Sequence, residues 1–96
     1  MNDNEIIALF FARKENAISA AAEKYGRYCH TIAHNILSSR PDAEECVNDT
    51  YLNAWNSIPP QKPDNLAAYL GKITRNLALN RWKRNSVAKR VSGQVE

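Results

Sequence analysis

A segment near the C-terminal end of the sequence carries side chains suited to binding a polyanion. Residues 73–84, ITRNLALNRWKR, keep a helical apolar rhythm but hold four cations, two asparagines, one tryptophan and no acidic residue. Lysine and arginine neutralise phosphates, and asparagine hydrogen-bonds phosphates or base edges. An aromatic ring beside them can stack on an unpaired base. The segment therefore favours nucleic-acid binding, and on charge alone a solvated basic tail is the alternative.

The charge of the chain is divided between its two parts. Residues 1–60 hold 5 Lys and Arg against 8 Asp and Glu, whereas residues 61–96 hold 8 against 2. The formal net charge of all 96 residues is only +3. Such a division suggests two partners, one polyanionic and one that meets an acidic or mixed face. The cationic field of the second part is extended by Arg81, Arg84, Lys89 and Arg90.

An acidic face is expected on the helix that contains the sequence DAEECVNDTYLNAW. On a helical wheel the inward side holds small and apolar residues, namely Ala43, Cys46, Val47, Thr50, Tyr51, Ala54 and Ile58. The opposite side holds acids, amides and a leucine: Glu45, Asn48, Asp49, Leu52 and Asn56, flanked by Glu44 and Trp55. Acidic groups around an apolar anchor suit a basic helical partner. A solvated face with one stray leucine is the alternative.

Catalytic and metal chemistry do not assemble in this sequence. His30 and His34 are four residues apart, a spacing that can hold zinc, and Cys29 is near, but a zinc site needs three or four converging ligands. No glycine-rich phosphate loop or nucleophile–base pair stands out, and carboxylates on an exposed face lack a desolvated pocket. We expect no enzyme activity, no metal and no cofactor. Cys29 and Cys46 are expected to be buried, reduced thiols.

The elements that position these residues are all helical. Apolar spacing predicts four helices and no strand, with helices over residues 3–13, 15–38, 42–57 and 66 to the high 80s. The second carries a continuous apolar stripe of Ile18, Ala22, Tyr25, Cys29, Ile32 and Ile36. Asp42 and Glu45 are expected to form a capping box at the start of the third helix, and Pro59 and Pro60 to end it. Asp64 or Asn65 is expected to cap the fourth.

These elements predict an all-α fold, a compact bundle of about four helices formed by one domain over residues 1–96. No stretch approaches the apolar length of a membrane span, and the N-terminus lacks the basic start of a secretory signal. We therefore expect no membrane insertion and a cytoplasmic location.

Two of the motifs together resemble a known family. DAEECVNDTYLNAW followed by AAYLGKITRNLALNRWKR is similar to region 2, the N-terminal promoter-reading domain, of extracytoplasmic-function sigma factors in the sigma-70 family. The likeness covers residues from about 15 to 90, and both motifs are long and stand at the family's separation. The resemblance implies a helical bundle that binds bacterial RNA polymerase and recognises and melts the minus-ten promoter element.

The resemblance also implies which residues meet each partner. The acidic motif docks on the clamp helices of the polymerase β′ subunit through Glu44, Glu45, Asn48, Asp49 and Leu52. The loop before the last helix receives a base flipped from the non-template strand of promoter DNA, through Pro60, Gln61, Lys62, Asp64 and Asn65. The melted strand is held along the last helix by Tyr69, Lys72, Arg75, Asn76, Asn80 and Lys83. An anti-sigma factor is a further implied partner.

The sequence departs from the family pattern in several places. Asn48 stands where glutamine is usual, and Tyr69 stands where tryptophan is common. The loop PPQKPDN holds three prolines, so the base preference of other members does not carry over to it. The region 4 helix-turn-helix domain that reads the minus-thirty-five element is absent from this sequence. We expect an isolated domain of a longer protein, which alone binds polymerase but initiates transcription poorly.

Two other functions stay open. A helical protein-interaction module could occupy polymerase or an anti-sigma factor as a decoy without reading DNA, and it would keep its function after loss of charge at Lys72, Arg75 and Lys83. A binder of double-stranded DNA of the helix-turn-helix type needs a short, glycine-containing turn, whereas the loop here is long and rich in proline.

Overall fold

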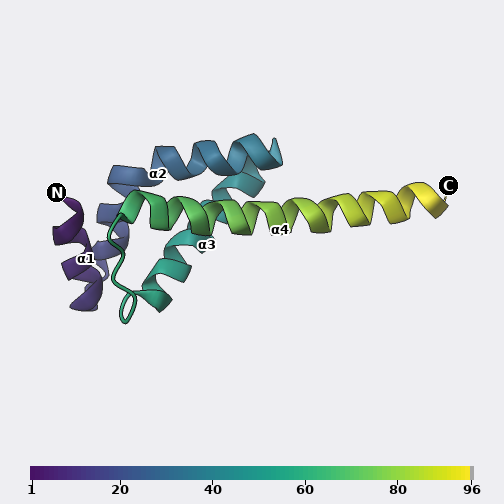
Figure 1. Ribbon diagram of the computed structural model, residues 1–96. Coiled ribbons are helices and arrows are strands. Elements are labelled where there is room, and N and C mark those ends of the chain that lie inside the picture. The colour runs from purple at the N-terminus through teal and green to yellow at the C-terminus, as the bar shows by residue number, and fades with distance from the viewer. Residues whose placement is uncertain (96) are drawn as a thin grey trace.

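Four helices make up the fold of residues 1–95, which confirms the all-α bundle predicted from the sequence. The computed structural model describes the backbone of residues 1–95 and the side chains of residues 1–87. The helices are α1 (Asp3–Phe11), α2 (Asn16–Leu37), α3 (Arg40–Ser57) and α4 (Leu66–Val95), and this part of the chain contains no strand. Helix α4 continues past the expected end in the high 80s and projects beyond the other three helices (Figure 1).

Polar side chains at their N-termini fix where α1 and α4 begin. Asn2 and Glu5 form a capping box on α1, in which each side chain accepts a hydrogen bond from the other residue's backbone N–H, at 2.9 and 3.1 Å. Of the two expected caps for α4, Asn65 takes the role, since its Oδ1 accepts from the backbone N–H of Ala68 at 3.0 Å. The loop before α4 is therefore fixed at its far end.

The start of α3 differs from the expectation. Ser39 occupies the N-cap position and its hydroxyl accepts from the backbone N–H of Asp42 at 3.4 Å, so that the helix begins at Arg40 with Pro41 in its first turn. Serine and proline are both favoured at these positions. The predicted capping box of Asp42 and Glu45 is therefore wrong, and both carboxylates reach α4 instead.

Small residues of α2 build the centre of the bundle, where α2 packs against each of the other three helices. The fully buried residues of α2 are Ala17, Ala21, Cys29 and Ala33. The isoleucines of the predicted stripe are only half-buried. Small side chains allow helix axes to lie close together. For this reason α2 turns its alanines, and not its isoleucines, toward the centre of the bundle. Two of these isoleucines, Ile32 and Ile36, line a groove described below.

Both cysteines are buried free thiols, as predicted. Burial raises the pKa of Cys29 and of Cys46 above the ordinary thiol value. The two thiols therefore stay protonated at neutral pH and act as core residues.

A buried pair of threonines joins α3 to α4. The hydroxyls of Thr50 and Thr74 lie 2.9 Å apart, and each also lies within hydrogen-bond distance of a carbonyl of its own helix, Cys46 at 3.0 Å and Leu70 at 2.8 Å. Each hydroxyl has one proton, so one threonine donates to the other and the second donates to its helix carbonyl. Neither buried hydroxyl is left without a partner, as buried polar groups require.

The threonine pair predicts a non-additive mutant cycle. Thr50→Val or Thr74→Val alone is expected to lower the free energy of unfolding by about 1 kcal/mol, because the hydrogen bond between the two buried hydroxyls is lost and the remaining hydroxyl keeps only the carbonyl of its own helix. The double variant is expected to cost less than the sum, since two apolar side chains of the same shape then face each other. Urea unfolding of the four proteins measures the cycle, and strictly additive costs would contradict it.

Candidate protein and nucleic-acid interfaces

The acidic residues of α3 lie on its outer surface, opposite the buried face of the helix. Glu44, Glu45, Asn48, Asp49 and Leu52 are all exposed, and Leu52 leaves 55% of its area open to solvent. The inward residues predicted for α3 are buried, apart from Tyr51, which is half-buried. An apolar side chain this exposed within a run of acids and amides forms a surface that a partner can cover. We call Glu44, Glu45, Asn48, Asp49 and Leu52 the acidic face.

Two residues of the acidic face are already engaged in ion pairs. Glu45 Oε1 lies 2.9 Å from Arg81 Nη1, and Asp42 Oδ1, just outside the acidic face, lies 3.0 Å from Arg81 Nη2. Glu44 pairs more loosely with Arg40 one turn earlier, at 3.4 Å, where both side chains are exposed. The hydrogen bond and charge of Arg81 hold the pKa of Glu45 below its usual value. Arg81 thus anchors α4 to α3.

The pairing of Arg81 corrects its expected place in the cationic field. Its side chain is largely covered, with 24% of its area exposed, and it faces α3 carboxylates. Residue spacing along α4 predicts which side chains share a face of this helix. It does not predict which cations form ion pairs with carboxylates of a neighbouring helix. Arg84 remains exposed. The side chains of Lys89 and Arg90, which were also assigned to this field, lie outside the described residues.

The predicted DNA-binding residues of α4 line one exposed surface, apart from Tyr69. Lys72, Arg75, Asn76, Asn80 and Lys83 are all exposed. None of these five takes part in an ion pair among the described residues. Trp82, with 51% of its area exposed, adds an aromatic surface to the same helix rather than packing against the bundle. This part of α4 offers cations, amides and an aromatic ring to solvent, which is the chemistry expected of a nucleic-acid surface.

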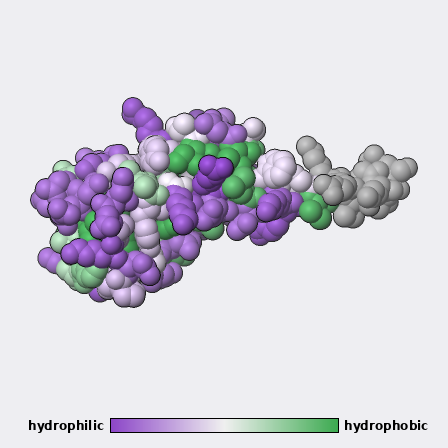
Figure 2. Space-filling model, in the orientation of Figure 1, coloured by the Kyte–Doolittle hydropathy of each residue, from purple (hydrophilic) through white to green (hydrophobic). Residues whose placement is uncertain are grey.

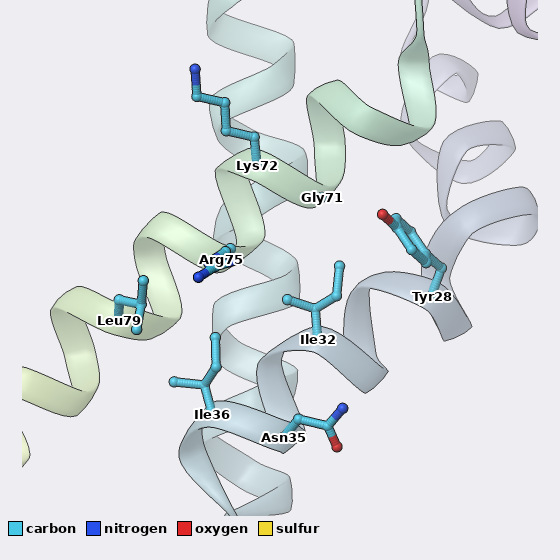
Figure 3. A pocket seen from close by; sticks show the side chains of 8 residues that line it. All are labelled: Tyr28, Ile32, Asn35, Ile36, Gly71, Lys72, Arg75 and Leu79. Atoms are coloured by element: carbon cyan, nitrogen blue, oxygen red, sulfur yellow. The ribbon is translucent and has the colours of Figure 1, made fainter.

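A groove of about 560 Å³ runs between α2 and α4 beside these cations. Lys72 and Arg75 stand at its α4 side, and Figure 3 shows Ile32 and Ile36 of α2 pointing toward α4 across it. At one end Tyr28 lies against Gly71, where an added Cβ would come within 2.8 Å of the tyrosine Oη. Figure 2 shows an apolar patch with hydrophilic borders where α2 and α4 meet.

The participation of α2 in this surface was not predicted. Ile32 and Ile36 belong to the apolar stripe that the sequence predicts to face the core, whereas Tyr28, one turn before Ile32, is not part of that stripe. The sequence does contain a signal that separates these isoleucines from the core. Ala17, Ala21 and Ala33 form a second apolar line one position away from the stripe, and only one of two adjacent lines can face the centre of the bundle.

The loop between α3 and α4 exposes most of its predicted binding residues. Pro60, Gln61, Lys62, Asp64 and Asn65 are exposed, although the Asn65 side chain is occupied as the cap of α4. Lys62 and Asp64 therefore leave one cation and one acid on the same short segment. We call residues 59–65 the capture loop, after the role that the family resemblance predicts for them.

Tyr69 is not a free stacking platform. It is half-buried, packs against the core, and its Oη lies 2.6 Å from the hydroxyl of Ser57. The tyrosine therefore ties the first turn of α4 to the last turn of α3 beneath the capture loop. Its predicted contact with DNA stays a prediction, limited to the part of the ring that is exposed.

No metal site is formed by the described residues. They include no group of three or more His, Cys, Asp or Glu side chains that could hold a metal ion, and the rings of His30 and His34 stack on each other with centroids 6.1 Å apart. None of the helices described is long and apolar enough to cross a membrane.

Comparison with known families gives this arrangement a name. The family model described as sigma-70 region 2 matches residues 21–87, which is 67 of the 96 residues. The chain belongs to the sigma-70 region 2 family. At the level of the family, region 2 binds core RNA polymerase and takes part in promoter melting. No curated protein and no solved structure matches the chain. Helix α1 and the residues up to Ala20 lie outside the matched stretch of this sigma-70 domain.

The Glu45–Arg81 pair predicts a pH dependence of the stability of this sigma-70 domain. Because the folded-state pKa of Glu45 lies below its usual value of 4.5, the pair contributes stability that is fully present above that value and lost as the pH falls through the folded pKa. Glu45→Gln is therefore expected to flatten the fall in melting temperature between about pH 5 and pH 3. Glu44→Gln, one residue away, is the control. Equal pH profiles for wild type and Glu45→Gln would contradict the assignment.

Proposed function

We propose that this chain is the region 2 domain of an extracytoplasmic-function sigma factor. In this proposal the acidic face binds the clamp helices of the polymerase β′ subunit in the cytoplasm. The capture loop and the cationic residues of α4 hold the non-template strand of the minus-ten promoter element after melting. The domain acts by binding alone and catalyses no covalent step, and an anti-sigma factor would restrain it by covering one of these surfaces.

The observation that carries the proposal is the separation of two exposed surfaces of opposite charge on one bundle. The acidic face lies on α3 and surrounds the exposed Leu52, while Lys72, Arg75 and Lys83 lie on α4. A single polyanion would be repelled by the first surface, and a single basic helix would be repelled by the second. Two partners of opposite charge fit this arrangement, as the division of charge along the sequence suggested.

Base capture can supply energy for melting. Unstacking a base costs a few kcal/mol, and contacts to the unstacked base and to the phosphates on either side offset this cost. The exposed amides of Asn76 and Asn80 can hydrogen-bond such bases. The proposal therefore requires that a single strand binds better than the same sequence in a duplex.

The polymerase half of the proposal is tested with a fragment of the β′ clamp helices. Asp49→Lys is expected to weaken binding at least about tenfold, because it places a cation in the centre of the acidic face. Glu23→Lys makes the same charge change at an exposed position of α2 and serves as the matched control. Fluorescence anisotropy gives both affinities, and undiminished binding by Asp49→Lys would rule out this face.

The DNA half is tested by salt-dependent binding of a minus-ten single strand. Lys72→Gln with Arg75→Gln is expected to reduce the slope of log affinity against log salt by about 1.4, since each phosphate contact on a single strand contributes about 0.7. Lys14→Gln with Arg27→Gln removes two exposed cations elsewhere and should leave the slope unchanged.

Two results would count against DNA reading. Equal affinity for the single strand and for the duplex would refute base capture. Polymerase binding with no DNA affinity at all would favour the protein-interaction module that acts as a decoy. The second result is informative because the acidic face does not depend on the cations of α4 other than Arg81.

A further inference from the structure

Arg13 occupies a backbone conformation that favours glycine. It follows α1 with a φ of 56°, in the left-handed region. Its N–H donates to the carbonyl of Phe10 at 3.0 Å, and the N–H of Lys14 donates to the carbonyl of Leu9 at 3.0 Å. These two bonds form the Schellman ending of a helix, in which glycine is usual at this position. An arginine held here points to a requirement for its side chain.

The side chain of Arg13 reaches the end of α3, more than forty residues away in the sequence. Its Nη1 donates to the carbonyl of Trp55 at 2.7 Å and to the carbonyl of Ile58 at 2.9 Å. Its guanidinium also lies over the indole of Trp55, 3.8 Å from the ring centroid. Such a stacked and hydrogen-bonded guanidinium is held by three separate contacts.

These carbonyls need a donor from outside their own helix. The residue that would donate to the carbonyl of Trp55 in a continued helix is Pro59, which has no N–H. Ile58 is the C-cap residue, and its carbonyl lies past the last helical bond. Arg13 therefore donates to two carbonyls that have no donor within α3, at the point where the capture loop leaves this helix.

The capture loop also returns to α1 farther along. Lys62 borders a hollow of about 310 Å³ whose other walls are residues of α1, namely Asn4, Ile7, Ala8 and Phe11. The far end of the loop is held by the Asn65 cap and by the contact of Tyr69 with Ser57. At the near end the N–H of Gln61 donates to the carbonyl of Ser57 at 2.9 Å, and Arg13 adds the side-chain contacts there. Arg13 lies outside residues 21–87 that the family model covers.

We propose that Arg13 is a positioning residue for strand capture, which holds the capture loop in the shape that receives an unpaired base. This inference rests on the proposed function. It differs from a phosphate contact, because the Nη1 atom of Arg13 is directed to backbone carbonyls and its charge is partly offset there. A positioning role and a phosphate contact make opposite predictions for Arg13→Lys. Lysine keeps the positive charge but lacks the planar guanidinium that donates to two carbonyls and stacks on the indole.

The test compares Arg13→Gly and Arg13→Lys with wild type in binding a minus-ten single strand at several salt concentrations. Glycine suits the backbone conformation, so Arg13→Gly removes the side chain while preserving the turn. Both variants are expected to bind about tenfold more weakly with an unchanged salt slope, since charge-assisted hydrogen bonds that shape the loop are lost and no phosphate contact is. Lys14→Ala removes the neighbouring exposed cation and is the control.

Two further readouts separate a positioning role from a general loss of fold. Binding to the β′ clamp-helix fragment should stay within about twofold of wild type, because the hydrogen bonds and the ring contact of Arg13 involve none of the five residues of the acidic face. An oligonucleotide series with one base removed at each position should show one position that matters for wild type and no longer matters for Arg13→Gly. In a Trp82→Phe background, the fluorescence of Trp55 should change in both Arg13 variants without DNA, since the guanidinium no longer covers the indole.

Each other outcome decides against the inference. Full affinity in Arg13→Lys, with a slope reduced by about 0.7 in Arg13→Gly, would make Arg13 a phosphate contact. Unchanged affinity in Arg13→Gly would refute any role in binding while leaving the proposed function intact. Failure of the wild type to prefer the single strand would refute the proposed function and this inference together.

Discussion

The buried contact between Thr50 and Thr74 fixes the register of α3 against α4, and the surface of the domain follows from that register. From this point the two antiparallel helices meet in order, with Ser57 bonded to Tyr69 at one end and Asp42 to Arg81 at the other. A shift of one residue would rotate α4 by about 100° against its partner. The separation of the acidic face from the cationic residues of α4 therefore depends on this register, which the threonine contact holds together with the contacts at both ends.

Arg81 connects the helix that carries the exposed cations to the acidic face. It belongs to the cationic helix by position, yet it binds Glu45 of the acidic face. A basic partner that approaches Glu45 would compete with Arg81 for the same carboxylate, while Asp42 would keep its bond to the other guanidinium nitrogen. Binding at the acidic face can thus alter one hydrogen bond of α4 without releasing the helix. This geometry links the proposed polymerase contact to the helix that is proposed to hold DNA.

Helix periodicity predicted the number of helices and the direction of most faces, because both depend on local apolar spacing. It failed where a side chain finds a partner far along the chain. Asp42 and Glu45 have the spacing of a capping box, but Ser39 is better placed as a cap and Arg81 attracts both carboxylates. In α2 two apolar lines compete for the core, and spacing alone does not show that alanines win when helices pack closely. Arg13 left no local signal, since its backbone conformation and its two carbonyl partners exist only in the folded chain.

The N-terminal helix is part of the folded unit although the family match begins after it. Ile6 and Phe10 are fully buried, and the ring of Phe10 packs at a tilted angle against Trp55, with centroids 6.3 Å apart. Trp55 is therefore held between an aromatic ring from α1 and the guanidinium of Arg13. Because the capture loop starts four residues after this indole, the contacts at its near end include residues that the matched stretch omits. The boundary of sequence similarity and the boundary of the cooperative structure differ here, and the second decides which residues can shape the proposed DNA site.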